Sequence, residues 1–437
     1  MRMVACLILT VASVASAADN SRLVHKFQRI QASPEFWAEG INWADFNRDG
    51  HGDMVCGPFW YAGPRFDQRH EYAPANQTFK RLGRDGAEEV IPGFEGGLGT
   101  NNAYSENFLT FTYDFNGDGW PDILVYGHPG KDGSWFENPR GRAGHWQRHV
   151  AYDNVEGESP DFGDITGDGK PEIVCCSRGH VGYAEADWTQ PSQPWRFHPI
   201  TPKGDWQRYS HGLGFGDING DGRADILEKD AWWEQPASRQ GDPVWTRHPF
   251  NFGTGGAQML VYDVNGDGLN DVITCLSAHE FGLAWFEQVR TGSELTFRQH
   301  TFMGEKPEDS PYRVKFSQPH ALALADMDAD GVLDLVTGKR FWAHGPTGDP
   351  EPNAPAVLYW FAIKRAKSGT VDFVPHLIDD NSGIGTQVVV ADINGDKLPD
   401  VLVGNKKGAF VFLHKVQRVS QAEWEAAQPK PFVQAKP

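Results

Sequence analysis

The chain has 437 residues, of which 39% are hydrophobic, and carries a formal net charge of −18. This length and apolar content allow a large buried core, and the acidity argues against a nucleic-acid-binding protein with a basic patch. The first 17 residues combine one Arg, an apolar stretch and an Ala15-Ser16-Ala17 cleavage site, which predicts a secretory signal peptide. We therefore expect a secreted or periplasmic protein cleaved near Ala17. No later run is long and apolar enough to predict a membrane span.

A nine-residue acidic motif recurs seven times. The copies begin at Asp45, Asp114, Asp164, Asp217, Asp263, Asp326 and Asp392, at intervals of 46 to 69 residues. The second copy, DFNGDGWPD, places oxygen-bearing side chains at positions 1, 3 and 5, Gly at position 6 and a carboxylate at position 9. This spacing suits a hard cation that takes several oxygen ligands in a tight turn. Recurrence at such intervals predicts a repeat protein with structural calcium (Ca²⁺) sites.

The expected calcium ligands are the side chains at positions 1, 3, 5 and 9. They are Asp45, Asn47, Asp49, Asp53, Asp114, Asn116, Asp118, Asp122, Asp164, Asp168, Glu172, Asp217, Asn219, Asp221, Asp225, Asp263, Asn265, Asp267, Asp271, Asp326, Asp328, Asp330, Asp334, Asp392, Asn394, Asp396 and Asp400. The loops hold 22 of the 58 acidic residues, and the other 36 stand against 40 Lys and Arg, so the acidity belongs to these loops. Arg48, Thr166 with Glu172, and Lys397 depart from the pattern, which leaves occupancy of the first, third and seventh loops open. The alternative for any loop is a solvated acidic turn.

Every repeat predicts four short strands. One precedes the loop, a β-branched strand follows it, an aromatic strand comes third, and a fourth carries an aromatic with a second marker three residues on. The fourth-strand markers are Phe27/Ile30, Phe79/Leu82, Trp146/His149, Trp195/His198, Trp245/His248, Phe297/His300 and Phe373/His376. This pattern predicts an all-β fold, a seven-bladed β-propeller over residues 18–414. Because Phe27 precedes the first loop and the chain ends after a third strand, the N-terminal strand should complete the last blade and close the ring. Residues 415–437 predict a short helix and a loose tail.

The loops and their strand context resemble the FG-GAP/VCBS repeat family, which includes integrin α-subunit heads and many secreted bacterial proteins. The resemblance covers nearly the whole chain after the signal peptide. It implies a propeller with calcium held by positions 1, 3, 5 and 9 and by a backbone carbonyl at position 7. It implies little about function.

Two recurring sets are expected to be structural. Cys56, Cys175, Cys176 and Cys275 follow loops at equivalent strand positions, which predicts buried thiols in separate blades rather than disulfides. The histidines of the fourth-strand markers are expected to pack in the outer strands. They are His149, His198, His248, His300 and His376.

The position six residues before each loop predicts a first ring of side chains. It holds Glu39, Phe108, Glu158, His211, Ala257, His320 and Thr386. This position opens the innermost strand, so these side chains should surround the end of the central channel opposite the loops. His and Glu converging there could hold a divalent or transition metal, with Glu39 and Glu158 as carboxylate ligands. The alternative is a set of unrelated polar residues lining a wet channel.

A second ring is predicted about six residues after each position-9 acid. It holds His128, Arg178 with His180, Lys229, His279, Lys339 with Arg340 and His344, and Lys406. The long insertions 83–105, 303–318 and 341–355 fall on the same face, which marks it as the functional face. The alternative is ordinary turn residues. The candidate catalytic residues of both rings are His211, His320, Lys339, Arg340, His128, His180 and His279.

Cationic groups and a metal suit an anionic or carbonyl-bearing sugar. Propellers of this kind are similar to secreted carbohydrate lyases and to the propeller of aldos-2-ulose dehydratase, which implies elimination next to a carbonyl or carboxylate. Such chemistry needs a base for the α-proton, here His211 or His320, and groups that stabilise the enolate, here Lys339 and Arg340. The alternative is a non-catalytic propeller that binds glycan or a protein partner. A buried metal or proton-transfer cluster would favour the enzyme, and an exposed aromatic rim would favour the binder.

Overall fold

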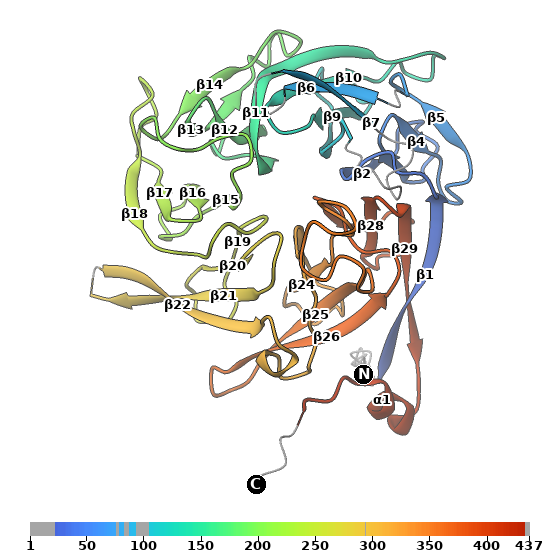
Figure 1. Cartoon of the computed structure of the whole chain (residues 1–437), viewed down its shortest axis with the longest axis vertical. Coiled ribbons are helices and arrows are strands. Elements are labelled where there is room, and N and C mark those ends of the chain that lie inside the picture. The colour runs from blue at the N-terminus through green and yellow to red at the C-terminus, as the bar shows by residue number, and fades with distance from the viewer. Residues whose placement is uncertain (1–21, 76–77, 83–86, 93–104, 293, 433–437) are drawn as a thin grey trace, which may run out of the picture.

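The computed structural model describes residues 22–75, 78–82, 87–92, 105–292 and 294–432. Antiparallel sheets of short strands stand side by side around a common centre (Figure 1). Within the described ranges the helical elements are the 3-10 turn η1 (Pro307–Asp309) and the helix α1 (Gln421–Ala427). The expected all-β fold is therefore confirmed. The predicted signal peptide lies outside the described residues, and inside them no helix has the length and apolarity needed to cross a bilayer.

Four sheets each hold the four strands of one repeat, in chain order. The first contains β2 (Ile41–Ala44), β3 (Asp53–Cys56), β4 (Phe59–Tyr61) and β5 (Arg69–Glu71). The others contain β15 (Leu213–Gly216), β16 (Asp225–Glu228), β17 (Ala231–Glu234) and β18 (Thr246–Pro249); β19 (Leu260–Tyr262), β20 (Asp271–Cys275), β21 (Leu283–Thr291) and β22 (Glu294–Met303); and β23 (Leu322–Ala325), β24 (Asp334–Gly338), β25 (Leu358–Arg365) and β26 (Val371–Asp379). In each, the acidic loop joins the first strand to the second.

The second and third repeats share one strand. Their sheet contains β8 (Leu109–Tyr113), β9 (Asp122–Tyr126), β10 (Lys131–Glu137), β11 (Gln147–Gly163), β12 (Glu172–Ser177), β13 (His180–Glu185) and β14 (Arg196–Pro199). The first half of β11 pairs with β10 and the second half with β12, so β11 is outermost in one repeat and innermost in the next.

The last sheet combines both ends of the chain. It contains β27 (Val388–Ala391), β28 (Asp400–Asn405), β29 (Gly408–Arg418) and β1 (Leu23–Ser33). β1 pairs with β29 antiparallel from Leu23↔Arg418 to Ser33↔Ala409. β29 thus continues past His414, the expected end of the repeats, before α1 begins.

A histidine stacks on an aromatic ring between the third and fourth strands of most repeats. Trp135–His149, Tyr183–His198, Trp232–His248, Trp285–His300 and Trp360–His376 lie nearly parallel, with ring centroids 4.0–5.0 Å apart. These histidines are therefore packed in the outer strands, as predicted. The four cysteines are free and buried, also as predicted.

The first repeat departs from the expected pattern. Phe79 and Leu82 were expected in its fourth strand, but they lie in β6 (Thr78–Leu82), which pairs only with β7 (Glu88–Pro92) in a separate hairpin. The fourth strand is β5, where His70 stacks on Trp60 with ring centroids 4.0 Å apart. The prediction was wrong for two reasons. The chain reverses direction earlier than expected, in a turn closed by the bond from the Ala62 N–H to the Gln68 carbonyl. In addition, β5 carries the stacked histidine without the aromatic residue that precedes it by three positions in other repeats.

Candidate functional site

Four donor side chains from four repeats meet at one point. Glu158, His211, His279 and His320, hereafter the His/Glu cluster, have ligand atoms within 4.8 Å of one another. The Nε2 atoms of His211 and His279 lie 3.0 Å apart. A Glu158 Oε2 atom lies 3.1 Å from His320 Nε2 and 3.5 Å from His211 Nε2. The structure therefore joins three first-ring residues with His279 of the second ring.

An irregularity in β11 directs Glu158 into this cluster. The β11–β12 register shifts between Glu156 and Asp161, and over this stretch the backbone N–H groups of Gly157 and Glu158 donate to Arg208 and Ser210 instead. A break of this kind re-aims a side chain. It brings Glu158 beside the segment that carries His211.

Interlocked loops hold the other two histidines. The N–H of Gln318 donates to the Glu280 carbonyl, next to His279, and the Gln318 carbonyl accepts from the N–H groups of His320 and Arg340. Gln318 has a positive φ of 60° and is fully buried, so this strained turn is fixed by its surroundings. A single residue thus ties together the backbones on which His279, His320 and Arg340 are mounted.

The tautomer of His211 directs a lone pair into the cluster. His211 Nδ1 lies 2.8 Å from the Tyr209 carbonyl, which can only accept, so Nδ1 carries the proton and Nε2 presents a lone pair. His279 Nδ1 lies 3.7 Å from Asp349 Oδ1 and makes no hydrogen bond among the described residues. Burial, followed by nearby positive charge, lowers the pKa of His320 to about 4 and also lowers the pKa of His279. Neutral imidazoles are the form that binds metal.

The spacing of the four donors fits a bound metal. Ligand atoms about 2.0–2.1 Å from a tetrahedral ion lie about 3.3 Å from one another. Three of the six separations, 3.0, 3.1 and 3.5 Å, are close to that value, and all six are within 4.8 Å. Without a cation, His320 Nε2–H can donate to Glu158 Oε2, and His279 Nε2–H can donate to His211 Nε2; a bound metal would take the place of these protons. Three imidazoles with one carboxylate suit zinc or another first-row transition metal better than calcium.

Arg340 and Glu39 form a buried ion pair behind the cluster. Arg340 Nε donates to Glu39 Oε1 at 3.1 Å, Nη2 donates to Oε2, and Nη1 lies 3.6 Å from Glu158 Oε2. The structure thus places Glu39, an expected metal ligand, against Arg340 rather than among the imidazoles. Although burial alone would raise it, the Arg340 and Lys406 charges hold the pKa of Glu39 below its ordinary value. The Arg340 guanidinium therefore interacts with two carboxylates, those of Glu39 and Glu158.

Two buried lysines flank this pair. Lys339 Nζ donates to Ser317 Oγ at 2.6 Å, and Lys406 Nζ donates to the Trp342 carbonyl at 2.5 Å. Burial lowers the pKa of each ammonium to about 8. Both side chains are at most 1% exposed, so they support the surrounding loops.

The insertion 341–355 contributes a His–Asp pair that sequence reasoning did not assemble. His344 Nδ1 lies 2.8 Å from Asp349 Oδ1, and the His344 and His279 ring centroids are 4.5 Å apart. Although burial alone would raise it, the hydrogen bond and charge of His344 keep the pKa of Asp349 low. Asp349 therefore lies between His279, which belongs to the cluster, and the half-exposed His344. In the sequence, only the length of the insertion indicated that this segment is functional.

Other second-ring candidates lie against other partners. His128 is buried between the rings of Phe108 and Tyr209. His180 Nδ1 bonds to the Thr201 carbonyl at 2.9 Å, and Arg178 pairs with Asp153. Lys229 pairs with Asp230. These groups are not part of the His/Glu cluster.

The acidic loops show one repeated arrangement. The position-9 carboxylate is buried, and one of its oxygens accepts from the N–H of loop position 2, as Asp271 does from Val264 at 2.9 Å. In six loops its other oxygen accepts an N–H from the third strand or the residues just after it, as Asp271 does from Gln288 at 2.7 Å. Burial raises the pKa of Asp271 to about 7. Each such carboxylate fastens its loop to the rest of its repeat.

Several loop acids also pair with a nearby basic side chain. Asp118, Asp221, Asp328 with Asp330, and Asp396 pair with Arg140, Arg223, Lys364 and Lys415, respectively. Carboxylates at positions 1, 5 and 9 of the third loop and at positions 1, 3 and 9 of the sixth have ligand atoms within 4.8 Å of one another. The donor sets are the oxygen ligands that calcium prefers.

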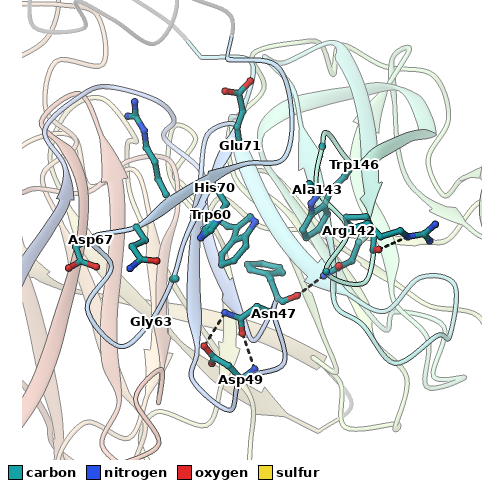
Figure 2. Close-up of a pocket in the computed structure, with 18 of the residues that line it drawn as sticks. Asn47, Asp49, Trp60, Gly63, Asp67, His70, Glu71, Arg142, Ala143 and Trp146 are labelled. Atoms are coloured by element: carbon teal, nitrogen blue, oxygen red, sulfur yellow. Dashed lines mark hydrogen bonds between the residues drawn. The ribbon is translucent and has the colours of Figure 1, made fainter.

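A large cavity lies away from the cluster. It has a volume of about 850 Å³ and opens between the first and second repeats, beside Asn47 and Asp49 of the first loop. Figure 2 shows Trp60 and Trp146 facing each other across it, with Arg142 and Glu71 at its edge. Trp60 already stacks on His70. No group of three potential metal ligands is found among its lining residues, which the structure describes.

The comparisons with known proteins bear on the fold. Residues 114–175 match the family model of the FG-GAP-like repeat, which confirms that resemblance over the second and third loops. No curated protein matches the chain. Similar solved structures include an Agrocybe aegerita lectin that recognises non-reducing terminal N-acetylglucosamine (13% identity, 93% of this chain and 98% of that chain, TM-score 0.44) and virginiamycin B lyase from Staphylococcus aureus (11%, 91% and 100%, 0.43). The exotype rhamnogalacturonan lyase YesX is also similar (12%, 89% and 72%, 0.41). At such low TM-scores and identities, these proteins do not indicate what this chain binds.

Proposed function

We propose that this protein is a seven-bladed β-propeller that uses a metal held by Glu158, His211, His279 and His320 to act on a carbonyl-bearing sugar. The observation that carries the proposal is the meeting of one carboxylate and three imidazoles, all potential metal ligands, from four separate repeats. The pairing of β1 with β29 supports a ring whose last blade is completed by the N-terminal strand.

The proposed reaction is elimination of water from the sugar. A divalent ion in the cluster would polarise the sugar carbonyl and stabilise the enolate charge. His344 is the proposed base, because the Asp349 carboxylate fixes its Nδ1–H tautomer and leaves Nε2 to accept a proton. This assignment replaces His211 and His320, whose Nε2 atoms face the other cluster donors.

The bonds balance within the substrate. His344 Nε2 takes the proton from the carbon next to the carbonyl, and the C–H electron pair forms a C=C bond. The C–O bond on the following carbon breaks, and the leaving oxygen departs as water after receiving the proton from His344. Asp349 stabilises the imidazolium between the two transfers. No external oxidant or reductant is needed.

We also propose calcium in the acidic loops. Their position-1, -3 and -5 oxygens are the hard donors that calcium takes, and a bound cation would offset the crowded carboxylates. The first, third and fifth loops show no ion pair with a basic side chain among their described residues, so they are the most open to calcium. Removal of calcium by a selective chelator should lower the unfolding temperature, because ligand binding to the folded state stabilises it.

Metal analysis tests the central proposal. The wild type and a His211→Ala/His320→Ala double variant are purified, and their metals are measured by mass spectrometry before and after mild chelation. We expect a non-calcium metal in the wild type that the double variant lacks. Keto-sugars are then incubated with both proteins, and the absorbance of an α,β-unsaturated carbonyl product is followed. Calcium alone in both proteins, with no product, would contradict the proposal and favour a propeller that only binds glycan or a protein partner.

A further inference from the structure

A second, smaller cavity shares a wall with the His/Glu cluster. It has a volume of about 350 Å³ and lies between the third and fourth repeats. His211 is one of its lining residues, with Ser159 and Gly212 beside it and Trp206 also in the lining. This volume falls at the lower end of the range for small-molecule sites, which suits a ligand as small as one monosaccharide.

Ser159 lines the cavity and has a buried hydroxyl. Its side chain is 1% exposed, and its Oγ has no hydrogen-bond partner among the residues that the structure describes. A buried hydroxyl without a partner costs free energy that a ligand hydroxyl could recover. The serine therefore points to a polar ligand.

Trp206 and the cavity floor supply an apolar surface. The half-buried Trp206 packs edge-on against Trp233, and Leu213 and Cys176 are buried beneath the cavity. A flat indole next to hydrogen-bonding groups suits a molecule with one apolar face and several hydroxyls. A sugar ring has this character.

The charges around the cavity favour a neutral ligand. Lys229 pairs with Asp230, and Arg247 donates to the Asp230 carbonyl at 3.1 Å and lies 3.8 Å from Glu228. The Glu228 carboxylate is 4% exposed and lines the cavity. The two cationic residues that line the cavity, Lys229 and Arg247, are therefore already paired with protein groups. An anionic ligand would be repelled by the buried Glu228 carboxylate.

We infer that this cavity is a subsite for a neutral, polyhydroxylated ligand, a single keto-sugar unit rather than a uronate. The ring stacks on Trp206, and one hydroxyl bonds to Ser159 Oγ. This inference rests on the proposed function, because it makes the cavity the sugar subsite beside the metal centre. It narrows the substrate from anionic or carbonyl-bearing sugars to neutral ones.

The test uses the metal-loaded full chain with D-fructose as the neutral probe and D-glucuronate as the anionic one. Binding is followed by saturation-transfer NMR at concentrations up to about 50 mM, well above a Kd of about 1 mM. We expect saturable fructose binding and weaker glucuronate binding. Trp206→Ala should weaken fructose binding at least about tenfold, and Ser159→Ala about fivefold.

Ser382→Ala is the matched control, because Ser382 Oγ is also buried without a hydrogen-bond partner among the described residues but does not line the cavity. It should bind fructose as the wild type does. If Trp206→Ala does not fold, Ser159→Ala alone decides, with its metal content as the measure of an intact centre. Normal metal content with no fructose binding, tighter glucuronate binding, or no effect of Ser159→Ala would overturn the inference. Fructose binding that depends on Ser159 in a protein without metal would support the subsite and contradict the proposed function instead.

Discussion

The acidic loops and the His/Glu cluster lie at opposite ends of the innermost strands. The loops recur in every repeat, whereas the cluster is formed only once. Each loop occupies the same place in its repeat, and its position-9 carboxylate accepts from the N–H of loop position 2. In contrast, the position that holds Glu158, His211 and His320 holds Phe108 and Ala257 in other repeats. Features that recur in every repeat maintain the fold, whereas a set assembled once at the centre can carry chemistry. Changes in the loops should therefore alter stability, and changes in the cluster should alter metal binding.

The largest effect is expected from a position-9 carboxylate. Asp271→Ala leaves the N–H groups of Val264 and Gln288 without their acceptor, and each buried orphan costs about 1–3 kcal/mol. We expect a loss of about 4 kcal/mol in the free energy of unfolding, measured by denaturant titration, with unchanged metal at the centre. In calcium-free protein, Asp267→Ala, on the exposed part of the same loop, should cost less than about 1 kcal/mol. If both variants lost the same free energy of unfolding, the buried position-9 acids would contribute no more to stability than the exposed acids of the loop.

A cluster ligand should show the opposite behaviour. Glu158→Gln keeps the side-chain shape but removes the charged donor from the cluster. Metal affinity, measured by competition with a chromogenic chelator, should fall at least about a hundredfold, or about 3 kcal/mol. The unfolding temperature of the metal-free protein should change little. His128→Gln is the control, since it alters an imidazole outside the cluster. The comparison fails if His128→Gln weakens metal binding as much as Glu158→Gln does.

The acid next to the cluster should have an intermediate effect. Asp349→Asn weakens the hold on His279 Nδ1 and on His344 Nδ1. Metal affinity should fall about tenfold, as for carboxylates that orient metal-bound histidines. Activity should fall further than metal occupancy does if His344 is the base. Glu351→Gln, an acid of the same insertion bonded to Lys315, should change neither quantity.

The repeated histidine stacks should affect only the pH dependence of stability. Burial lowers the pKa of His376 to about 4, below its ordinary value of 6.5. Between these values the unfolded chain binds a proton that the folded chain does not, so stability falls as the pH falls through this window. By about pH 5 the loss from this residue is roughly 2 kcal/mol. His376→Phe keeps a ring against Trp360, so its unfolding temperature should fall less between about pH 7 and pH 5. An unchanged pH dependence would show that other groups dominate.

The sequence predicted the repeated parts of the molecule more completely than its centre. The strand order of the repeats, the outer histidines and the buried thiols follow from local patterns. Equivalent positions also predicted that Glu158, His211 and His320 lie near one another. They did not show that Glu39 pairs with Arg340 or that His279 joins the cluster. Those contacts depend on the irregularity in β11, on the turn at Gln318 and on the fold of an insertion, none of which has a counterpart in other repeats.

The pairing of β1 with β29 bears on how the chain is made. His25 and His414, whose ring nitrogens lie 2.9 Å apart, are separated by 389 positions in the sequence. At about 5–20 residues per second, β1 leaves the ribosome roughly 20–80 s before β29 exists. During that time an eleven-residue strand lacks its only partner in the sheet. Folding that is delayed until synthesis is complete would bring both ends together and avoid a long-lived open edge.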